Sequence, residues 1–289
     1  LDRDCSRLTV TQTKEYSLVD QVSVRRVGDG LVTSRRSPTE YTLVELPLIA
    51  YLRDELGYSY LHPDAAMLLR GGENQVLLRD HLVAALVALN DIPEEAAAAI
   101  YSDLARQTSN EKWLAILRGG YSRKIAGEET HRPIKLIDFE DPEKNKFAVT
   151  NQLEIRGLSY RIPDVVVYVN GIPLVVIEAK SAIAKQDVYD AVTDIAVYEK
   201  ELPRLFQTNL FNIATNGTAL RFGSTGSRKE FWSTWRDPWP RPATDFTNEP
   251  MRQGLWALLA KDRLLDILAH FVVFEKDAHS GTSIKKMCR

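Results

Sequence analysis

The chain has 289 residues, with 37 lysine and arginine residues against 39 aspartate and glutamate residues, which gives a formal net charge of −2. A hydrophobic fraction of 44% and a charged fraction of 26% are ordinary for a packed globular protein and exclude disordered and collagen-like classes. No window approaches the roughly 20 apolar residues of a membrane span, so we expect no membrane partner. The balanced charge excludes a bulk polycation, so nucleic acid would have to bind to local patches.

Cysteine usage bears on the cellular compartment. The two cysteines, Cys5 and Cys288, lie near opposite ends of the chain and suggest neither a disulfide framework nor a zinc site. The first residues contain neither a basic segment nor an apolar segment, so no secretory signal is visible. Both observations favour the reducing cytoplasm as the location of the protein.

The amino-terminal part of the chain has a helical pattern. Residues 1–40 are polar with little periodicity, and we expect an arm that carries one strand. The spacing of apolar residues then predicts amphipathic helices over 42–56, 77–90 and 93–107, of which the first ends at Gly57. This part is therefore expected to be a helical prefix to the rest of the fold.

The pattern changes after residue 120. Continuous β-branched and apolar runs are typical of strands that are covered on both faces. They predict strands over 134–139, 147–155, 165–169 and 174–177, and the dipeptides Asn170-Gly171 and Asn216-Gly217 are strong hairpin signals. Helices are expected over 185–200 and 251–271, and a polar, basic tail over 275–289. The irregular connection over 226–250 contains Trp232, Trp235 and Trp239, which we expect to pack against the domain, with stacking on bases as the alternative. The order predicts an α/β sheet with a helical prefix.

Two acids and a lysine stand at the ends of two strands that are otherwise too apolar to hold charge. Asp164 precedes the run 165–169, and Glu178 and Lys180 follow the run 174–177. Buried charges are costly unless they are paired or bind a metal. Two converging carboxylates would suit Mg²⁺, and the lysine could hold a metal-bound water toward a phosphodiester. This is the chemistry of PD-(D/E)xK nucleases, and the alternative is a surface ion pair that closes a hairpin.

The register of the predicted hairpin decides whether the two acids can meet. In a two-residue turn at Asn170-Gly171, Glu178 would pair with Pro163, and Asp164 would lie on the opposite face of the sheet. Metal binding requires both acids on one face, because side chains alternate along a strand. A register shifted by one residue is therefore required.

The shifted register makes specific predictions about neighbouring pairs. It places Val166 opposite Val176 and Tyr168 opposite Leu174. It also requires a connection of odd length, such as three residues with a bulge and with Gly171 in the left-handed conformation. A two-residue turn without a compensating bulge would remove the site.

Several motifs together resemble the amino-terminal nuclease domain of type I restriction enzyme R subunits. The resemblance covers about residues 40–275. Its motifs are KLIDF at 135–139, NKFAVTNQ at 145–152, PD at 163–164 and VNGIPLVVIEAKS at 169–181, with supporting matches at 44–49, 56–58, 198, 202–203, 205–206, 216–217 and 221–223.

The resemblance implies a fold, a domain organisation and partners. The expected fold is restriction-endonuclease-like, with a central mixed sheet flanked by helices, over 41–275. Residues 276–289 would begin a linker to an ATP-driven DNA translocase that this sequence does not contain. The activity would be Mg²⁺-dependent cleavage of double-stranded DNA within a complex with methylation and specificity subunits. No phosphate-binding loop motif occurs, so ATP would bind only to the missing motor.

The resemblance also assigns roles to residues. Asp164 and Glu178 correspond to metal ligands, and Lys180 corresponds to the catalytic lysine. Tyr198 matches the tyrosine of a Gln-x-x-x-Tyr motif, but Asp194 stands where that motif has glutamine. A carboxylate cannot donate the hydrogen bonds of an amide. Asp194 is therefore a substitute, an additional acid near the metal, or a solvated helix residue.

Two further questions stay open at this stage. Glu45 could supply a third carboxylate to the metal, although its spacing from Thr42 also fits a helix capping box. The rival to nuclease activity is a non-catalytic module that docks the motor onto its partners. A degenerate nuclease would be expected to lose Asp164, Glu178 or Lys180, and all three are present.

Overall fold

The computed structural model describes residues 25–27, 30–32, 40–181, 187–276 and 283–287. The chain divides into two compact units, Leu1–Ser37 and Pro38–Arg289. In the first unit, β1 (Arg25–Val27) and β2 (Gly30–Val32) form an antiparallel pair, where the sequence suggested a single strand. The second unit contains every candidate site residue.

A six-stranded mixed sheet forms the centre of the second unit. Its order is β12-β11-β10-β9-β6-β3. The bounds are β3 (Ser59–Leu61), β6 (Phe147–Asn151), β9 (Val165–Val169), β10 (Ile172–Ala179), β11 (Phe211–Thr215) and β12 (Leu220–Gly223). The pairs β3–β6 and β10–β11 are parallel, and the other three are antiparallel. All residues of β6, β9, β10 and β11 are buried, as their continuous apolar runs predicted.

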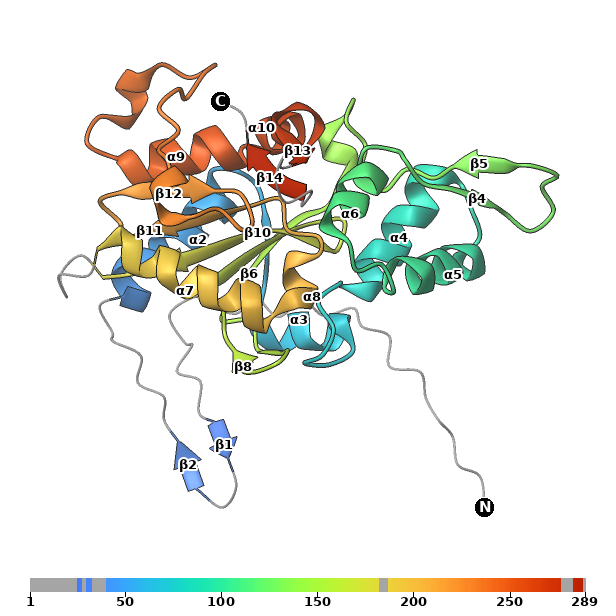
Figure 1. Cartoon of the computed structure of the whole chain (residues 1–289), viewed down its shortest axis with the longest axis horizontal. Coiled ribbons are helices and arrows are strands. Elements are labelled where there is room, and N and C mark those ends of the chain that lie inside the picture. The colour runs from blue at the N-terminus through green and yellow to red at the C-terminus, as the bar shows by residue number, and fades with distance from the viewer. Residues whose placement is uncertain (1–24, 28–29, 33–39, 182–186, 277–282, 288–289) are drawn as a thin grey trace. The chain divides into compact units, whose positions relative to one another are not determined.

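Helices cover both faces of this sheet. Their bounds are η2 (Tyr41–Glu45, a π-helical turn), α2 (Leu46–Asp54), α7 (Val188–Glu201), α8 (Pro203–Phe206), α9 (Pro250–Leu259) and α10 (Lys261–Asp266). On one face the ring of Phe147 contacts Tyr58, whose hydroxyl donates to the carbonyl of Leu259 in α9. On the other face α7 packs against β10 and β11, and the two sets of helices lie on opposite sides of the sheet (Figure 1). The fold is the α/β, restriction-endonuclease-like arrangement that the sequence predicted.

A helical region lies beside the sheet in Figure 1. It contains α3 (Pro63–Arg70), α4 (Arg79–Asn90), α5 (Glu94–Leu104) and α6 (Asn110–Leu117), with the short strands β4 (Ser122–Lys124) and β5 (His131–Pro133). The predicted helices over 77–90 and 93–107 correspond to α4 and α5. The backbone N–H of Leu78, before α4, donates to the carbonyl of Gly171, which connects this region to the turn between β9 and β10.

The predicted strand over 134–139 is wrong. Ile134, Leu136 and Ile137 of this segment are buried, but apart from the bond of the Ile134 N–H to the carbonyl of Tyr121, asparagine side chains rather than a strand ladder bond its backbone. Asn145 accepts from the N–H of Asp138 and donates to the carbonyl of the same residue, and Asn170 donates to the carbonyl of Leu136. Burial without a ladder partner is possible because the amide supplies both a donor and an acceptor.

The carboxyl-terminal region also differs from expectation. The predicted helix over 251–271 is interrupted at Ala260, whose ψ of 137° is not helical, and continues as α10 and the π-helical η6 (Ile267–Phe271). The tail expected over 275–289 takes part in the antiparallel pair β13 (Val272–Lys276) and β14 (Ser283–Met287). Lys285 of β14 is buried, although the sequence marks this tail only as polar and basic.

The remaining elements are short. They are η3 (Pro142–Lys144), β7 (Ile155–Arg156), β8 (Tyr160–Arg161), η4 (Lys229–Phe231) and η5 (Ala243–Phe246). In the tryptophan-rich connection Trp232 and Trp235 are buried, as predicted, whereas Trp239 is exposed. No helix among the described residues has the length and apolar character that crossing a membrane requires.

Candidate active site

The hairpin of β9 and β10 begins with a two-residue turn. Asn170 and Gly171 both have positive φ, 51° and 78°, and Val169 pairs with Ile172. The predicted three-residue connection is therefore wrong, and so is the predicted partner of Tyr168, which is Pro173. Positive φ at both turn positions matches the right-handed twist of the strands it joins.

A β-bulge restores the register that the site requires. The pairing shifts by one residue between Pro173 and Val175, so that Val166 pairs with Val176, as predicted. Extending this register past the last pair sets Asp164 opposite Glu178. The bulge therefore brings both acids to one face, and the N–H of Ala179 donates to Asp164 Oδ2 over 2.9 Å.

Glu178 is buried and only partly satisfied. Its Oε1 accepts from Lys180 Nζ at 3.0 Å and from the hydroxyl of Tyr198 at 3.2 Å. Its Oε2 is buried and has no hydrogen-bond partner among the described residues. Burial, followed by the charge of Asp164, raises the pKa of Glu178 well above its ordinary value. A cation at Oε2 would relieve both effects.

Lys180 bridges two carboxylates. Besides Glu178, its Nζ lies 2.7 Å from Asp194 Oδ2 of α7. Burial works against the charged amine, but Glu178 and Asp194 outweigh it, and the pKa of Lys180 is raised. The lysine is therefore a fixed positive charge. Asp194 is 44% exposed but paired with Lys180, so it is not merely a solvated helix residue.

Tyr198 lies one helical turn beyond Asp194 on α7. Burial and the neighbouring acids, Glu178 first among them, raise the pKa of Tyr198, so that its hydroxyl keeps its proton. The protonated hydroxyl donates to Glu178. The spacing of four residues places both side chains of α7 on the same helix face, toward β10.

Glu45 also reaches this region. It is fully buried, and its Oε2 accepts from Gln152 Nε2 at 2.6 Å, while the same nitrogen lies 3.4 Å from Asp164 Oδ1. The N-cap of its helical turn is Glu40, so Thr42 lies inside the helix and the capping-box interpretation is wrong. Carboxylate oxygens of Glu40, Glu45 and Asp164 lie within 4.8 Å of one another.

Glu40 and Gln152 were missed as members of the site. Glu40 stands at the last position of the segment interpreted as an arm, where no periodicity distinguishes it. Gln152 belongs to a motif that carries the family resemblance, but its left-handed backbone, with φ of 51°, is not visible in the sequence. Only that motif could have drawn attention to it.

The donor set fits a hard divalent cation. Asp164, Glu178, Glu45 and Glu40 offer carboxylate oxygens, which are the ligands that Mg²⁺ prefers. The carboxylates of Glu40, Glu45 and Asp164, whose oxygens lie within 4.8 Å of one another, repel one another unless positive charge balances them. The Oε2 of Glu178, which has no hydrogen-bond partner in the described part of the chain, is the specific atom that favours a metal over a closed ion-pair network.

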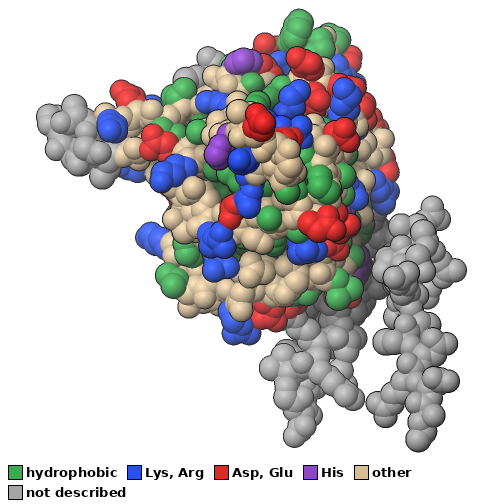
Figure 2. Space-filling view, turned by 90° about the vertical axis from the view of Figure 1, so that its right-hand side faces the viewer, with side chains coloured by type: hydrophobic (Ala, Val, Ile, Leu, Met, Phe, Trp, Pro, Cys, Tyr) green, Lys and Arg blue, Asp and Glu red, His purple; other side chains and the backbone are tan. Residues whose placement is uncertain are grey.

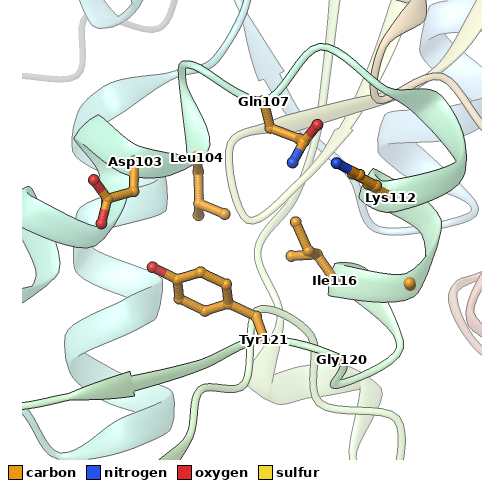
Figure 3. A pocket seen from close by; sticks show the side chains of 8 residues that line it. Asp103, Leu104, Gln107, Lys112, Ile116, Gly120 and Tyr121 are labelled. Carbon is orange, nitrogen blue, oxygen red and sulfur yellow. The ribbon is translucent and has the colours of Figure 1, made fainter.

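A separate cavity of about 280 Å³ lies away from these residues. It is formed by α5, α6 and the segment before β4, and Figure 3 shows Leu104, Ile116 and Tyr121 directed toward its centre. None of the predicted site residues lines it. The candidate active site is therefore separate from this cavity and lies at one end of the β9–β10 hairpin, where Asp164, Glu178 and Lys180 are buried.

The sequence matches a known family over most of this unit. The model of the family described as "Type I restriction enzyme R protein N terminus" matches residues 37–231. This range includes Glu40, Glu45, Asp164, Glu178, Lys180 and Tyr198. The match ends before α9, α10 and the β13–β14 pair.

Two curated relatives are named as endonuclease subunits of type I restriction enzymes. The chain is 30% identical over 232 residues, 75% of its length, to the type I restriction enzyme HindI endonuclease subunit of Haemophilus influenzae. It is 26% identical over 284 residues, 86% of its length, to the putative type I restriction enzyme MjaIXP endonuclease subunit of Methanocaldococcus jannaschii. These alignments cover 22% and 27% of the relatives, so the chain spans about a quarter of their length.

Proposed function

Because the chain belongs to the family of type I restriction enzyme R protein N termini, we propose that it is a Mg²⁺-dependent endonuclease module that hydrolyses phosphodiesters of double-stranded DNA. The larger part of the R subunit would be an ATP-driven translocase, and methylation and specificity subunits would complete the complex. The expected compartment is the cytoplasm, where these components and the DNA meet.

One observation carries this proposal. The bulged β9–β10 hairpin sets Asp164 and Glu178 on one face of the sheet, and Lys180 Nζ lies 3.0 Å from Glu178 Oε1. Asp164 and Glu178 would hold the metal, with Glu45 as a further acid nearby. When bound, Mg²⁺ supplies Lewis-acid activation of the phosphate and lowers the pKa of a bound water.

The side chains themselves have separate tasks. Lys180 carries a fixed positive charge, held by Glu178 and Asp194, that would stabilise negative charge developing on the phosphate. Tyr198 donates to Glu178 and orients this carboxylate on β10. Because Glu178 Oε1 accepts from both Lys180 and Tyr198, Oε2 is the oxygen available for the metal.

The alternative function is a docking module without catalysis. A purely structural ion pair between Glu178 and Lys180 would explain their burial together. It does not explain why Glu178 Oε2 is buried without a partner among the described residues, since such an atom costs about 1–3 kcal/mol. The geometry therefore favours the nuclease.

The test uses the full R subunit assembled with its partner subunits. Asp164→Ala, Glu178→Ala and Lys180→Ala should each abolish DNA cleavage while ATP hydrolysis and translocation continue, because the motor is a separate domain. Glu129→Ala, at an exposed acid in the β4–β5 connection, is the matched control and should cut like wild type. Wild-type cleavage by Asp164→Ala would remove the proposed site.

A further inference from the structure

Gln152 has an unusual backbone for its residue type. It follows β6 directly and has a φ of 51°, in the left-handed region that glycine and asparagine tolerate best. Its N–H donates to the carbonyl of Asp164 at 2.7 Å, and the N–H of Leu153 donates to the carbonyl of Pro163. Strained backbone of this kind persists only where its surroundings fix it.

The side chain of Gln152 lies between two acids from different elements. Its Nε2 donates to Glu45 Oε2 at 2.6 Å and lies 3.4 Å from Asp164 Oδ1. Glu45 comes from the first helical turn, whereas Asp164 precedes β9, and both carboxylates are buried. One neutral amide therefore donates toward two carboxylates that would otherwise repel each other.

Turn geometry alone does not account for glutamine at this position. Glycine or asparagine would adopt the same backbone with less strain. What glutamine adds is an amide with enough reach to contact Glu45 while its backbone is paired with Asp164. The side-chain contact, rather than the turn, is the property that distinguishes glutamine here.

We propose that Gln152 is a positioning residue that holds the Glu45 carboxylate beside Asp164, so that the first helix contributes an acid to the metal site. This inference rests on the proposed function, because it concerns the same metal. Replacing a residue that hydrogen-bonds to a metal ligand and orients it typically lowers the metal affinity by about 10–100-fold.

The first experiment measures Mn²⁺ binding by the whole 289-residue chain by calorimetry, together with its melting temperature. Gln152→Gly removes the amide and relaxes the backbone. We expect the melting temperature to change little, because the relaxed backbone offsets the lost hydrogen bond, and Mn²⁺ binding to weaken about tenfold. Asp91→Gly, at an exposed residue with φ of 50° after α4, is the matched control, because it relaxes a left-handed backbone away from the metal site.

A double-mutant cycle tests whether Gln152 acts through Glu45. Glu45→Gln removes the charge that Gln152 holds, so adding Gln152→Gly to that variant should weaken Mn²⁺ binding no further. If the two substitutions weaken Mn²⁺ binding independently, so that their fold-changes multiply, the inference is overturned.

Gln152→Asn is the second variant if the glycine variant does not fold. Asparagine tolerates the left-handed backbone, but its side chain is one methylene shorter and should not reach Glu45. The Gln152→Asn chain should therefore bind Mn²⁺ as weakly as the glycine variant.

The outcomes separate this inference from the proposed function. If the wild-type chain binds Mn²⁺ and Asp164→Ala does not, the metal site stands, and equal binding by wild type and Gln152→Gly would then overturn the role of Gln152 alone. If the wild-type chain binds no Mn²⁺ at all, both proposals fail. Weakened binding in Gln152→Gly with an intact fold, and no further loss in the Glu45→Gln background, is the expected result.

Discussion

At the scale of single residues, Asp194 shares the charge of Lys180 with Glu178. The buried Glu178 is the inner partner, and the partly exposed Asp194 is the outer one. Partly exposed ion pairs contribute about 0–1 kcal/mol. Asp194 therefore helps to orient the Lys180 side chain, whereas the ion pair with Glu178 is sufficient to hold the ammonium group beside the two acids.

Replacing Asp194 should consequently have a graded effect. In the full complex, Asp194→Ala should slow DNA cleavage by up to about fivefold, as expected from the loss of roughly 1 kcal/mol. Asp194→Asn should be milder, because its amide oxygen can still accept from Lys180. Cleavage rates under single-turnover conditions measure both, with Lys180→Ala for comparison. An Asp194→Ala protein as inactive as Lys180→Ala would mean that Asp194 takes a direct part in the reaction.

The sequence identifies some of these residues better than others. Asp164, Glu178 and Lys180 stand out because charge is rare at the ends of apolar strands. Glu40 and Gln152 do not stand out, since their importance depends on how a helix and a strand end meet in space. The contact between Gln152 and Glu45 joins positions 107 residues apart, which no local pattern encodes.

At the scale of elements, the turn between β9 and β10 both sets the hairpin and contacts α4. Gly171 has a φ of 78°, and a Cβ at this position would lie 2.5 Å from the carbonyl oxygen of Leu78 and 2.9 Å from the nitrogen of Leu82. The backbone requires glycine for its conformation and also for the close approach of the helix.

Substitution at this turn should therefore cost more than backbone strain. Gly171→Ala should lower the free energy of unfolding by about 2 kcal/mol or more, because it combines a left-handed alanine with a clash against backbone. Gly127→Ala is the matched control, since its φ is 90° but nothing lies within 4 Å of the added Cβ. Urea unfolding of both variants separates the two contributions, and equal losses would show that the α4 contact is unimportant.

The β14 strand introduces a buried lysine with a pH-dependent contribution to stability. Lys285 Nζ donates to Asn110 Oδ1 at 2.8 Å, to the carbonyl of Asn209 and to Thr225 Oγ1. Burial lowers the pKa of Lys285 from 10.5 to about 7, although Glu199 opposes the shift. Between these two values the unfolded chain binds more protons than the folded one, so stability increases as the pH rises.

The effect should appear as a difference between variants. The free energy of unfolding of wild type relative to Lys285→Met should increase by about 1 kcal/mol or more from pH 7 to pH 9.5, because one pKa unit corresponds to about 1.4 kcal/mol. Lys286→Met replaces the exposed neighbour on the same strand and should follow the wild-type curve. A difference that is flat or decreases with pH would show that Lys285 keeps its charge in the folded state.

At the scale of the whole molecule, the continuous apolar runs were enough to predict β6, β9 and β10 and the mixed α/β class, whereas the short edge strand β3 was missed. The segment 134–139 was misassigned because asparagine side chains took the place of a ladder, and the bulge after Pro173 was not visible in an unbroken apolar run. The helices α3 and α6 were missed. Their apolar stripes are short, and their burial depends on neighbours that the sequence does not specify.

The charge of the chain bears on its affinity for duplex DNA. The net charge is −2, and on the face shown in Figure 2 lysine and arginine side chains are interspersed with aspartate and glutamate. A chain with net charge close to zero has little overall attraction for the phosphate backbone, so its binding to DNA should be weak and should rest on counterion release at local basic groups.

We therefore expect the isolated chain to bind duplex DNA weakly and without sequence preference. Its Kd should be on the order of 10⁻⁴–10⁻⁶ M at physiological salt, which is typical of non-specific binding, and the logarithm of affinity should fall linearly with that of salt concentration. Fluorescence anisotropy with two duplexes of unrelated sequence, from 50 to 200 mM KCl and without divalent cations, measures both properties. Each duplex should give the same Kd and the same salt slope, since phosphate contacts carry no sequence information. A tight complex with only one of the two duplexes would place sequence recognition in this chain instead of in a partner subunit.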